Sequence, residues 1–333
     1  MSPARGRTSW ILVAAVPILF VVALLVGRYG IRIEETFRAL LGLDGVSDVF
    51  RALILRVRLP RALAAACIGA NLAITGAAFQ GLFRNPLVDS RILGVSSGAA
   101  FGAAVALLLS AGTLGLQASA FAFALLAVAL VLLIGARFGS APLVLVIGGI
   151  LVSALFNALL GLIKYVADPL SSLPAITYWL LGGLSQASWT SVTPLCAVTG
   201  AGLLFFLAIR WRLNVLTLSD VEASALGVRV RGLRVAVVGV GTVLIASSVA
   251  VGGMIGWIGL VVPHIARAWV GPDHGRLIPV SAALGIATLL ALDTIARNAI
   301  ASEIPLGILT GLIGVPAFLL LFLRFLRSRG EAR

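Results

Sequence analysis

The sequence predicts an all-α polytopic membrane protein of about ten transmembrane helices, several of them short or broken. Of its 333 residues, 60% are hydrophobic and only 11% are charged, and the mean hydropathy is +1.13. A soluble domain carries about 25% charged residues. Apolar runs of about 20 residues, the length that crosses a bilayer as a helix, recur along the chain. A transmembrane barrel would instead show alternating segments of about 10 residues.

The charge and the cysteines narrow the class of function. The net charge of +13 does not indicate nucleic-acid binding, because Lys and Arg gather in the cytoplasmic loops of membrane proteins. Cys67 and Cys196 lie in apolar runs without the spacing of metal ligands, so we expect packing residues, no metal site and no disulfide. The sequence has no P-loop, so any nucleotide hydrolysis belongs to another chain.

The apolar runs place the spans in order. Residues 8–27 follow Arg5 and Arg7 and are expected to remain as an uncleaved first span, because no small-residue cleavage site closes the run. The run 92–136 has room for two helices with a turn near residues 110–113. The run 235–266 holds two helices, at least one of them short, because glycines interrupt it at 252, 253 and 256. The other spans are 62–83, 138–163, 191–209, 277–300 and 304–323.

Ten spans that begin inside place both termini in the cytoplasm. Of the 25 Lys and Arg residues, 16 then lie in cytoplasmic segments, as the positive-inside rule requires. The exception is the first external loop, residues 28–61, where seven Arg residues accompany four acids. These arginines either have a role outside or pair partly with those acids. We expect one transmembrane domain, residues 1–333, with a cytoplasmic loop at about 211–234.

Three arginines are expected at one external mouth. Arg58 and Arg61 precede the second span, and Arg297 lies near the external end of the ninth. Arginine forms bidentate pairs with carboxylates, so the three are able to present a basic surface to an acidic partner. The alternative is that their side chains snorkel to the membrane interface.

A polar turn follows the second span at residues 84–89. Asn85 precedes Pro86 and is therefore disfavoured in the helical region, which ends the span and presents the Asn85 amide on a turn. The turn is either a cytoplasmic gate or an ordinary loop.

The cytoplasmic loop contains a helix signal. Ser219 and Glu222 have the spacing of a capping box, and Gly227 stands where a helix would end. We expect a short helix of about two turns that either seats on a peripheral subunit or serves as a solvated connector.

Asp293 and His264 are candidate polar sites inside apolar runs. Asp293 is the most deeply placed acid, and we favour an i,i+4 ion pair with Arg297 over a role in proton transport. His264 follows Pro263, which should bend its helix. Because His274 is the only other histidine, we expect a structural polar contact at His264, not a metal site.

Together, the motifs from the second span to the last resemble the FecCD-type permeases of bacterial ABC importers. The stretches that carry the resemblance are Arg58-Leu59-Pro60-Arg61, Arg84-Asn85-Pro86-Leu87, Leu93-Gly94-Val95-Ser96-Ser97-Gly98, Trp179-Leu180-Leu181-Gly182-Gly183, Ile258-Gly259-Leu260-Val261-Val262-Pro263-His264-Ile265-Ala266-Arg267 and Glu303-Ile304-Pro305-Leu306-Gly307.

The resemblance implies half of a homodimeric permease with one pathway at the dimer interface. It also implies two ATP-binding cassette subunits, which bind ATP and Mg, and a periplasmic binding protein. This chain would then hold no cofactor and no catalytic residue. The implied roles are docking of the binding protein for Arg58, Arg61 and Arg297, the cytoplasmic gate for Asn85 and Leu87, and coupling to the ATPase for Ser219, Glu222, Ala223 and Gly227.

The start of the fifth span departs from the family pattern. Some relatives have a pair of small hydroxyl residues there, where this chain has Ser140-Ala141-Pro142-Leu143. The second half of the gate therefore stays open.

The expected function is ATP-driven import of haem, or a related iron chelate, across the bacterial cytoplasmic membrane by alternating access. Haem is favoured because the spans offer no polar contacts for a siderophore, yet ferric-siderophore and cobalamin permeases share these motifs. An ion-coupled secondary transporter is the alternative of another class, but it would need several intramembrane carboxylates, and only Asp293 is available.

Overall fold

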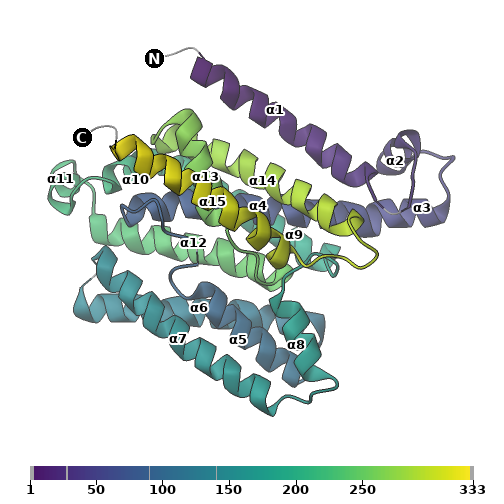
Figure 1. The fold of residues 1–333 in the computed structure, drawn as a ribbon, viewed down its shortest axis with the longest axis horizontal. Helices are drawn as coiled ribbons and strands as arrows, with labels where there is room; N and C mark the ends of the chain where they lie inside the picture. The colour runs from purple at the N-terminus through teal and green to yellow at the C-terminus, as the bar shows by residue number, and fades with distance from the viewer. Residues whose placement is uncertain (1–3, 28, 90, 140, 331–333) are drawn as a thin grey trace.

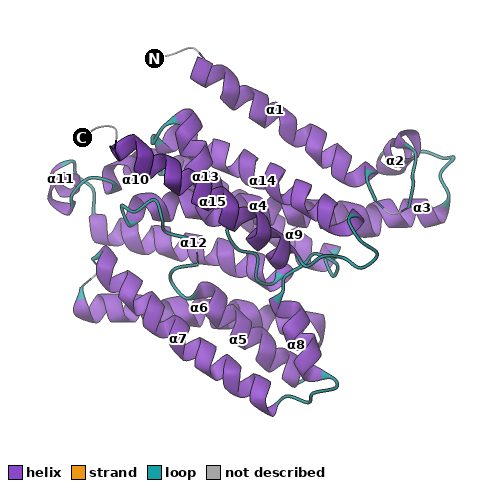
Figure 2. Ribbon diagram, in the orientation of Figure 1, coloured by secondary structure: helices purple, strands orange, loops and turns teal. Residues whose placement is uncertain are grey.

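The computed structural model describes residues 4–27, 29–89, 91–139 and 141–330, and all regular structure in these residues is helical (Figures 1 and 2). In chain order the elements are α1 (Ala4–Leu25), α2 (Ile33–Leu40), α3 (Asp48–Ala52), the π-helical segment η1 (Leu53–Arg58), α4 (Leu59–Leu82), α5 (Val95–Leu108), α6 (Gly112–Phe138), α7 (Pro142–Val166), α8 (Ser172–Leu180), α9 (Trp189–Ala208), α10 (Arg210–Leu216), α11 (Asp220–Ala225), α12 (Val230–Gly252), α13 (Ile258–Val270), α14 (His274–Asn298) and α15 (Leu306–Gly330).

The predicted spans correspond to helices of the structure. Among the described residues, six helical stretches are long and apolar enough to cross a bilayer, and four shorter apolar helices accompany them. The run 92–136 is divided into α5 and α6 at the predicted turn. The run 235–266 is divided after Gly252 into α12 and a short α13 of 13 residues.

Several elements differ from the prediction. The predicted external loop 28–61 contains α2, α3 and η1, and the stretch between the predicted spans 138–163 and 191–209 contains α8. The predicted cytoplasmic loop is shorter than residues 211–234, because α12 already begins at Val230. α7 begins at Pro142, four residues after the predicted start, since proline favours the first turn of a helix.

Helix α4 is the centre of the bundle and packs against α14, α12, α13 and α9 (Figure 1). Two glycines of α4, which have no side chain, allow this close approach. A Cβ at Gly69 would overlap the carbonyl of Gly285 in α14, and a Cβ at Gly76 would overlap the carbonyl of Gly259 in α13. Small residues at helix crossings are typical of membrane bundles, where close van der Waals contact takes the place of the hydrophobic drive.

Pro263 explains part of the contact between α4 and α13. Proline has no N–H, so the Gly259 carbonyl four residues earlier has no donor in its own helix. The bare Cα of Gly76 lies against that carbonyl oxygen. The same proline that interrupts the hydrogen-bond ladder therefore marks the point where the two helices meet.

Helices α5, α6 and α7 form a second group that contacts the centre through α12. Each contributes one ring to an aromatic cluster, in which the Phe101 and Phe123 centroids are 5.0 Å apart and the Phe101 and Phe156 centroids 5.7 Å apart. Both described chain ends lie at one end of the molecule with α10 and α11, and α2 and α3 lie at the other (Figure 1). The two ends of α4 therefore belong to opposite faces.

Candidate functional site

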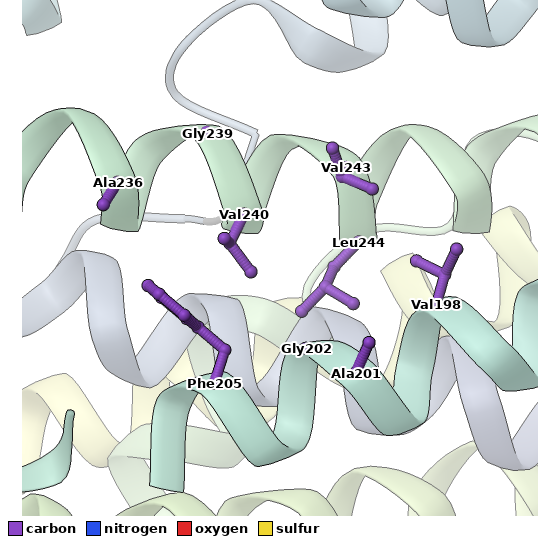
Figure 3. Close-up of a pocket in the computed structure, with 9 residues that line it drawn as sticks. All are labelled: Val198, Ala201, Gly202, Phe205, Ala236, Gly239, Val240, Val243 and Leu244. Carbon is purple, nitrogen blue, oxygen red and sulfur yellow. The ribbon is translucent and has the colours of Figure 1, made fainter. Parts of the chain in front are cut away.

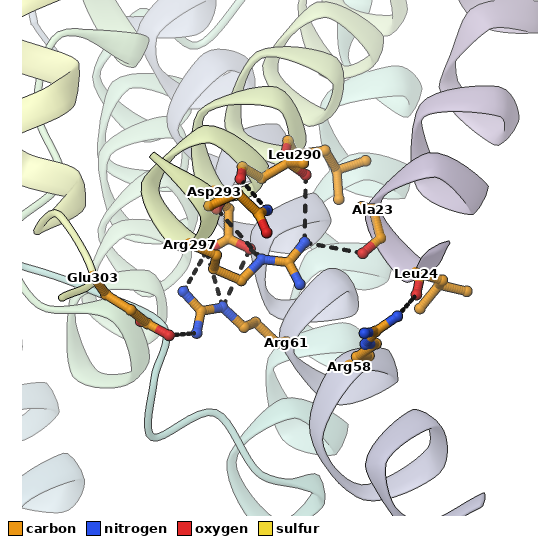
Figure 4. Close-up of polar contacts among 10 residues, drawn as sticks. Ala23, Leu24, Arg58, Arg61, Leu290, Asp293, Arg297 and Glu303 are labelled. Carbon is orange, nitrogen blue, oxygen red and sulfur yellow. Dashed lines mark hydrogen bonds and ion pairs between the residues drawn. The ribbon is translucent and has the colours of Figure 1, made fainter. Parts of the chain in front are cut away.

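A buried charge cluster (Figure 4) lies at the end of α4 on the side of α2 and α3 (Figure 1). Asp293 of α14 is 2% exposed and accepts from Arg61 Nε at 3.0 Å and Nη2 at 2.9 Å. It also pairs with Arg297 Nε at 3.1 Å, which confirms the predicted i,i+4 ion pair. Arg61 Nη1 lies 2.8 Å from Glu303 in the loop before α15. Two arginines and two carboxylates thus balance one another.

Two arginines at the same end of the molecule bind the C-terminal carbonyls of α1. Arg58 Nη1 donates to the carbonyls of Leu24 and Leu25 at 2.8 and 3.0 Å, and Arg297 Nη2 donates to the carbonyl of Ala23 at 2.9 Å. The last carbonyls of a helix have no donor within it and carry partial negative charge. The two guanidinium groups satisfy them, so α1 is fastened to α4 and α14 by hydrogen bonds as well as by apolar contact.

The three predicted docking arginines are therefore close together, as expected, but they are buried. Arg58, Arg61 and Arg297 are 4%, 7% and 8% exposed. They do not form the basic surface that the sequence suggested, because each guanidinium is engaged inside the chain. Their docking role stays a prediction. Sequence spacing could not reveal Asp293 and Glu303 as the partners of Arg61, since Asp293 lies 232 residues from Arg61.

The turn after α4 lies at the opposite end of the helix. Arg84 N donates to the Gly81 carbonyl and Asn85 N to the Gln80 carbonyl, the two bonds of a Schellman ending. The Asn85 side chain accepts from Leu87 N at 2.9 Å, so its amide shapes the turn. Asn85 and Leu87 are exposed, Leu87 to 47%. Ser140, at the expected second half of the gate, lies outside the described residues.

Asp220 joins this turn to two other elements. Its Oδ1 lies 2.6 Å from Arg84 Nη2 and 2.7 Å from Arg234 Nη2, which belongs to α12. Arg84 Nε also donates to the Leu216 carbonyl, the last residue of α10. Hydrogen bonds from Arg234, followed by those from Arg84, lower the pKa of Asp220 below its ordinary value of 3.8.

The predicted helix in the cytoplasmic loop is α11. Ser219 Oγ accepts from Glu222 N, and Ser219 N donates to Glu222 Oε2 at 2.8 Å, so the capping box is confirmed. Gly227 has a φ of +78° and ends the helix as predicted. Ala223 is buried at 0% exposure, so a partner cannot contact its side chain. The exposed apolar residues are others, which sequence reasoning missed: Leu218, Val221 and Leu226.

Asn214 of α10 fastens the same region to α14. Its Oδ1 accepts from the backbone N of His274 at 2.8 Å, and its Nδ2 donates to Asp273, the N-cap of α14. This contact was not predicted, because residues 214 and 273 are far apart in sequence. No hydrogen-bond partner of His264 Nδ1 is found among the described residues, so the expected polar contact is not seen at that atom.

The apolar cavity in Figure 3 lies between α9 and α12 and has a volume of about 440 Å³. Its walls are made of small and apolar residues: Val198, Ala201, Gly202, Phe205, Ala236, Gly239, Val240, Val243 and Leu244. It has no charged side chain in its lining and so offers nothing to orient a charged substrate. The polar features with a specific arrangement are those at the two ends of α4.

Comparison with known proteins identifies the family. The sequence matches the FecCD transport family over residues 15–324. The chain belongs to this family. The molybdate import permease MolB of Haemophilus influenzae is 38% identical over 303 residues, 90% of each chain. The hemin permease HmuU of Yersinia pestis is 36% identical over 329 residues, 96% of this chain and 98% of that one. The cobalamin permease BtuC of Halobacterium salinarum is 42% identical over 279 residues, 83% and 75% of the two chains.

A solved structure supports the same assignment. An ABC transporter of the metal-chelate type, in an inward-facing conformation, superposes with a TM-score of 0.87 and 37% sequence identity over 96% of this chain and 99% of that one. This FecCD member is thus the permease subunit of an ABC importer and is not itself an enzyme, since the ATPase is a separate subunit. The all-helical prediction and the recognition of the family are both confirmed.

Proposed function

We propose that this FecCD permease forms a homodimer in the bacterial cytoplasmic membrane and imports haem, or a related iron chelate, by alternating access. We base the choice of substrate on the apolar face of α7. It is exposed along the helix at Leu143, Ile147, Leu151 and Leu155, and the sequence has no charge from Pro142 to Ile163. Such a face suits a large chelate that must be released, and the hemin permease matches nearly the whole chain.

The two ends of α4 supply the proposed mechanism. Two ATPase subunits, which bind ATP and Mg, would meet each permease dimer at α11, where Val221 is 81% exposed. The turn with Asn85 and Leu87 would close the pathway on that side. A periplasmic binding protein would dock at the opposite end. Its acidic groups would compete with Asp293 and Glu303 for Arg61 and Arg297, and with the Leu24 and Leu25 carbonyls for Arg58.

Molybdate import is the second candidate, because the molybdate permease is 38% identical to this chain. A small oxyanion requires N–H donors or cations along its path. The residues from Pro142 to Ile163 provide no charged group for this, which is why we place it second.

Uptake into vesicles tests the proposal. The permease is reconstituted with its ATPase, and haem, a ferric siderophore, cobalamin and molybdate are each offered on a loaded binding protein. We expect ATP-dependent uptake with haem and the strongest stimulation of ATP hydrolysis by the haem-loaded protein. If only the molybdate-loaded binding protein stimulated ATP hydrolysis, molybdate would be the substrate in place of haem. Uptake without ATP would overturn the assignment to an ATP-driven importer.

A further inference from the structure

Arg84 occupies a backbone conformation that does not suit an arginine. Its φ is +50°, in the left-handed region, at the position where a Schellman ending usually has glycine. A residue with a Cβ is strained there, whereas glycine is not. Arginine at this position therefore indicates that its side chain is needed.

The Arg84 side chain connects the turn to the cytoplasmic loop. Nη2 lies 2.6 Å from Asp220 at the start of α11, and Nε donates to Leu216 at the end of α10 at 3.2 Å. The side chains of Arg84 and Asp220 are 34% and 51% exposed. Ion pairs of such exposure add little to stability, so stability alone does not account for the strained arginine.

The rest of the turn behaves as one unit with Arg84. The Asn85 side chain accepts a hydrogen bond from Leu87 N within the same turn. Gln80, one helical turn earlier, donates to the carbonyls of Val88 and Leu260 at 3.4 and 3.3 Å and accepts from Arg267 at 2.9 Å. A displacement of Arg84 is therefore passed to the exposed side chains of Asn85 and Leu87 and not absorbed within a loose loop.

We propose that the Arg84–Asp220 ion pair transmits motion of α11 to the turn that holds Asn85 and Leu87. The inference rests on the proposed function, in which α11 meets the ATPase and the turn closes the pathway. Arg84 is a positioning residue in this scheme: it contacts no substrate. Asp220 also forms an ion pair with Arg234 of α12, so one carboxylate connects both α12 and the turn to α11.

Arg84→Gly separates transmission from folding, because it removes the ion pair and the backbone strain together. We expect the reconstituted complex to assemble, to keep its thermal midpoint and to hydrolyse ATP, while substrate imported per ATP falls about tenfold. Asp220→Asn should give at least as large a loss, because it also removes the carboxylate that pairs with Arg234 of α12. The double variant should lose no more than Asp220→Asn alone, since both changes break the same Arg84–Asp220 pair. Glu34→Gln, which breaks the exposed pair with Arg38 at the other end of the molecule, is the matched control and should leave uptake per ATP unchanged.

The outcomes distinguish the inference from the function on which it rests. Unchanged uptake per ATP in Arg84→Gly overturns the inference and leaves the importer intact. Loss of the ATPase from the Arg84→Gly complex also overturns it, because the pair would then serve assembly. A wild-type complex without ATP-driven uptake overturns the proposed function and the inference with it.

Discussion

Asp293 lies between two guanidinium groups, and both depend on it for charge balance. Its side chain is 2% exposed, and those of Arg61 and Arg297 are 8% and 10% exposed. Removing one partner of a buried ion pair leaves the other charge uncompensated, which costs far more than the pair contributes. Replacing a single carboxylate oxygen of this cluster by an amide group should therefore have a large effect on stability.

Asp293→Asn is expected to destabilise the protein by about 3–5 kcal/mol. The amide keeps the volume of the carboxylate but leaves two buried arginines with Glu303 alone. The thermal midpoint in detergent measures the effect. Glu34→Gln should change it little, because Glu34 and Arg38 form an exposed pair worth about 0–1 kcal/mol. Equal midpoints for the two variants would contradict the structural role of Asp293.

Asp220 gives a prediction about pH. Its folded-state pKa is lowered, first by hydrogen bonds from Arg234, so its contribution is complete above the ordinary value of 3.8 and is lost only as the pH falls through the lowered value. Uptake per ATP should therefore not change through Asp220 between about pH 5 and pH 8. A step in that range that is present in the wild type and absent in Asp220→Asn would show that the pKa is not lowered.

The central element is α4, whose packing relies on two bare backbones. Gly76→Ala places a methyl group against the Gly259 carbonyl, a backbone atom that cannot rotate away. We expect a loss of about 1–3 kcal/mol from overpacking, seen as a lower thermal midpoint. The control is Gly239→Ala in α12, where an added Cβ meets no atom within 4 Å. It should gain about 0.5–1 kcal/mol, as alanine does over glycine in a helix. Equal effects would show that the two helices do not touch there.

Elements with local signals could be predicted from the sequence, and long-range contacts could not. Hydropathy located the spans, glycines located the break after Gly252, and the Ser219–Glu222 spacing located α11, since each signal lies within a few residues. The short helix α2 was missed because the loop is polar overall, although Ile33 and Phe37 have the i,i+4 spacing of one helical face. The pairing of Arg84 with Asp220, 136 residues apart, has no signal in a single sequence.

The same limit applies to the candidate site. The sequence grouped Arg58, Arg61 and Arg297 correctly at one end, because hydropathy sets the depth of each residue. It did not reveal that they are buried, because burial depends on contacts with α1 and on the contact of Arg61 with Asp293, which join distant parts of the chain. Cys67 and Cys196 likewise face each other with their Sγ atoms 3.4 Å apart, a contact between α4 and α9 that composition did not indicate.

Contacts within the molecule account for four of the seven arginines in the predicted external loop 28–61. Arg58 and Arg61 are buried and bonded within the chain. Arg38 pairs with Glu34, and Arg51 donates to the carbonyl of Leu43 at 2.6 Å. Arginines that are engaged with carbonyls and carboxylates in this way have structural partners on their own side, so this loop does not argue against a cytoplasmic position for α10 and α11.

This orientation leads to a prediction for the intact cell. Asp44, between α2 and α3, and Val221, on α11, are both exposed, and these elements lie at opposite ends of the molecule (Figure 1). A membrane-impermeant thiol reagent should label Asp44→Cys in intact spheroplasts, and Val221→Cys only after the membrane is opened. The parent chain measures the background of Cys67 and Cys196, which lie in spanning helices. Labelling of Val221→Cys in sealed spheroplasts would reverse the assigned orientation in the membrane. It would also contradict the assignment of α11 to the ATPase and of the arginine cluster to the binding protein.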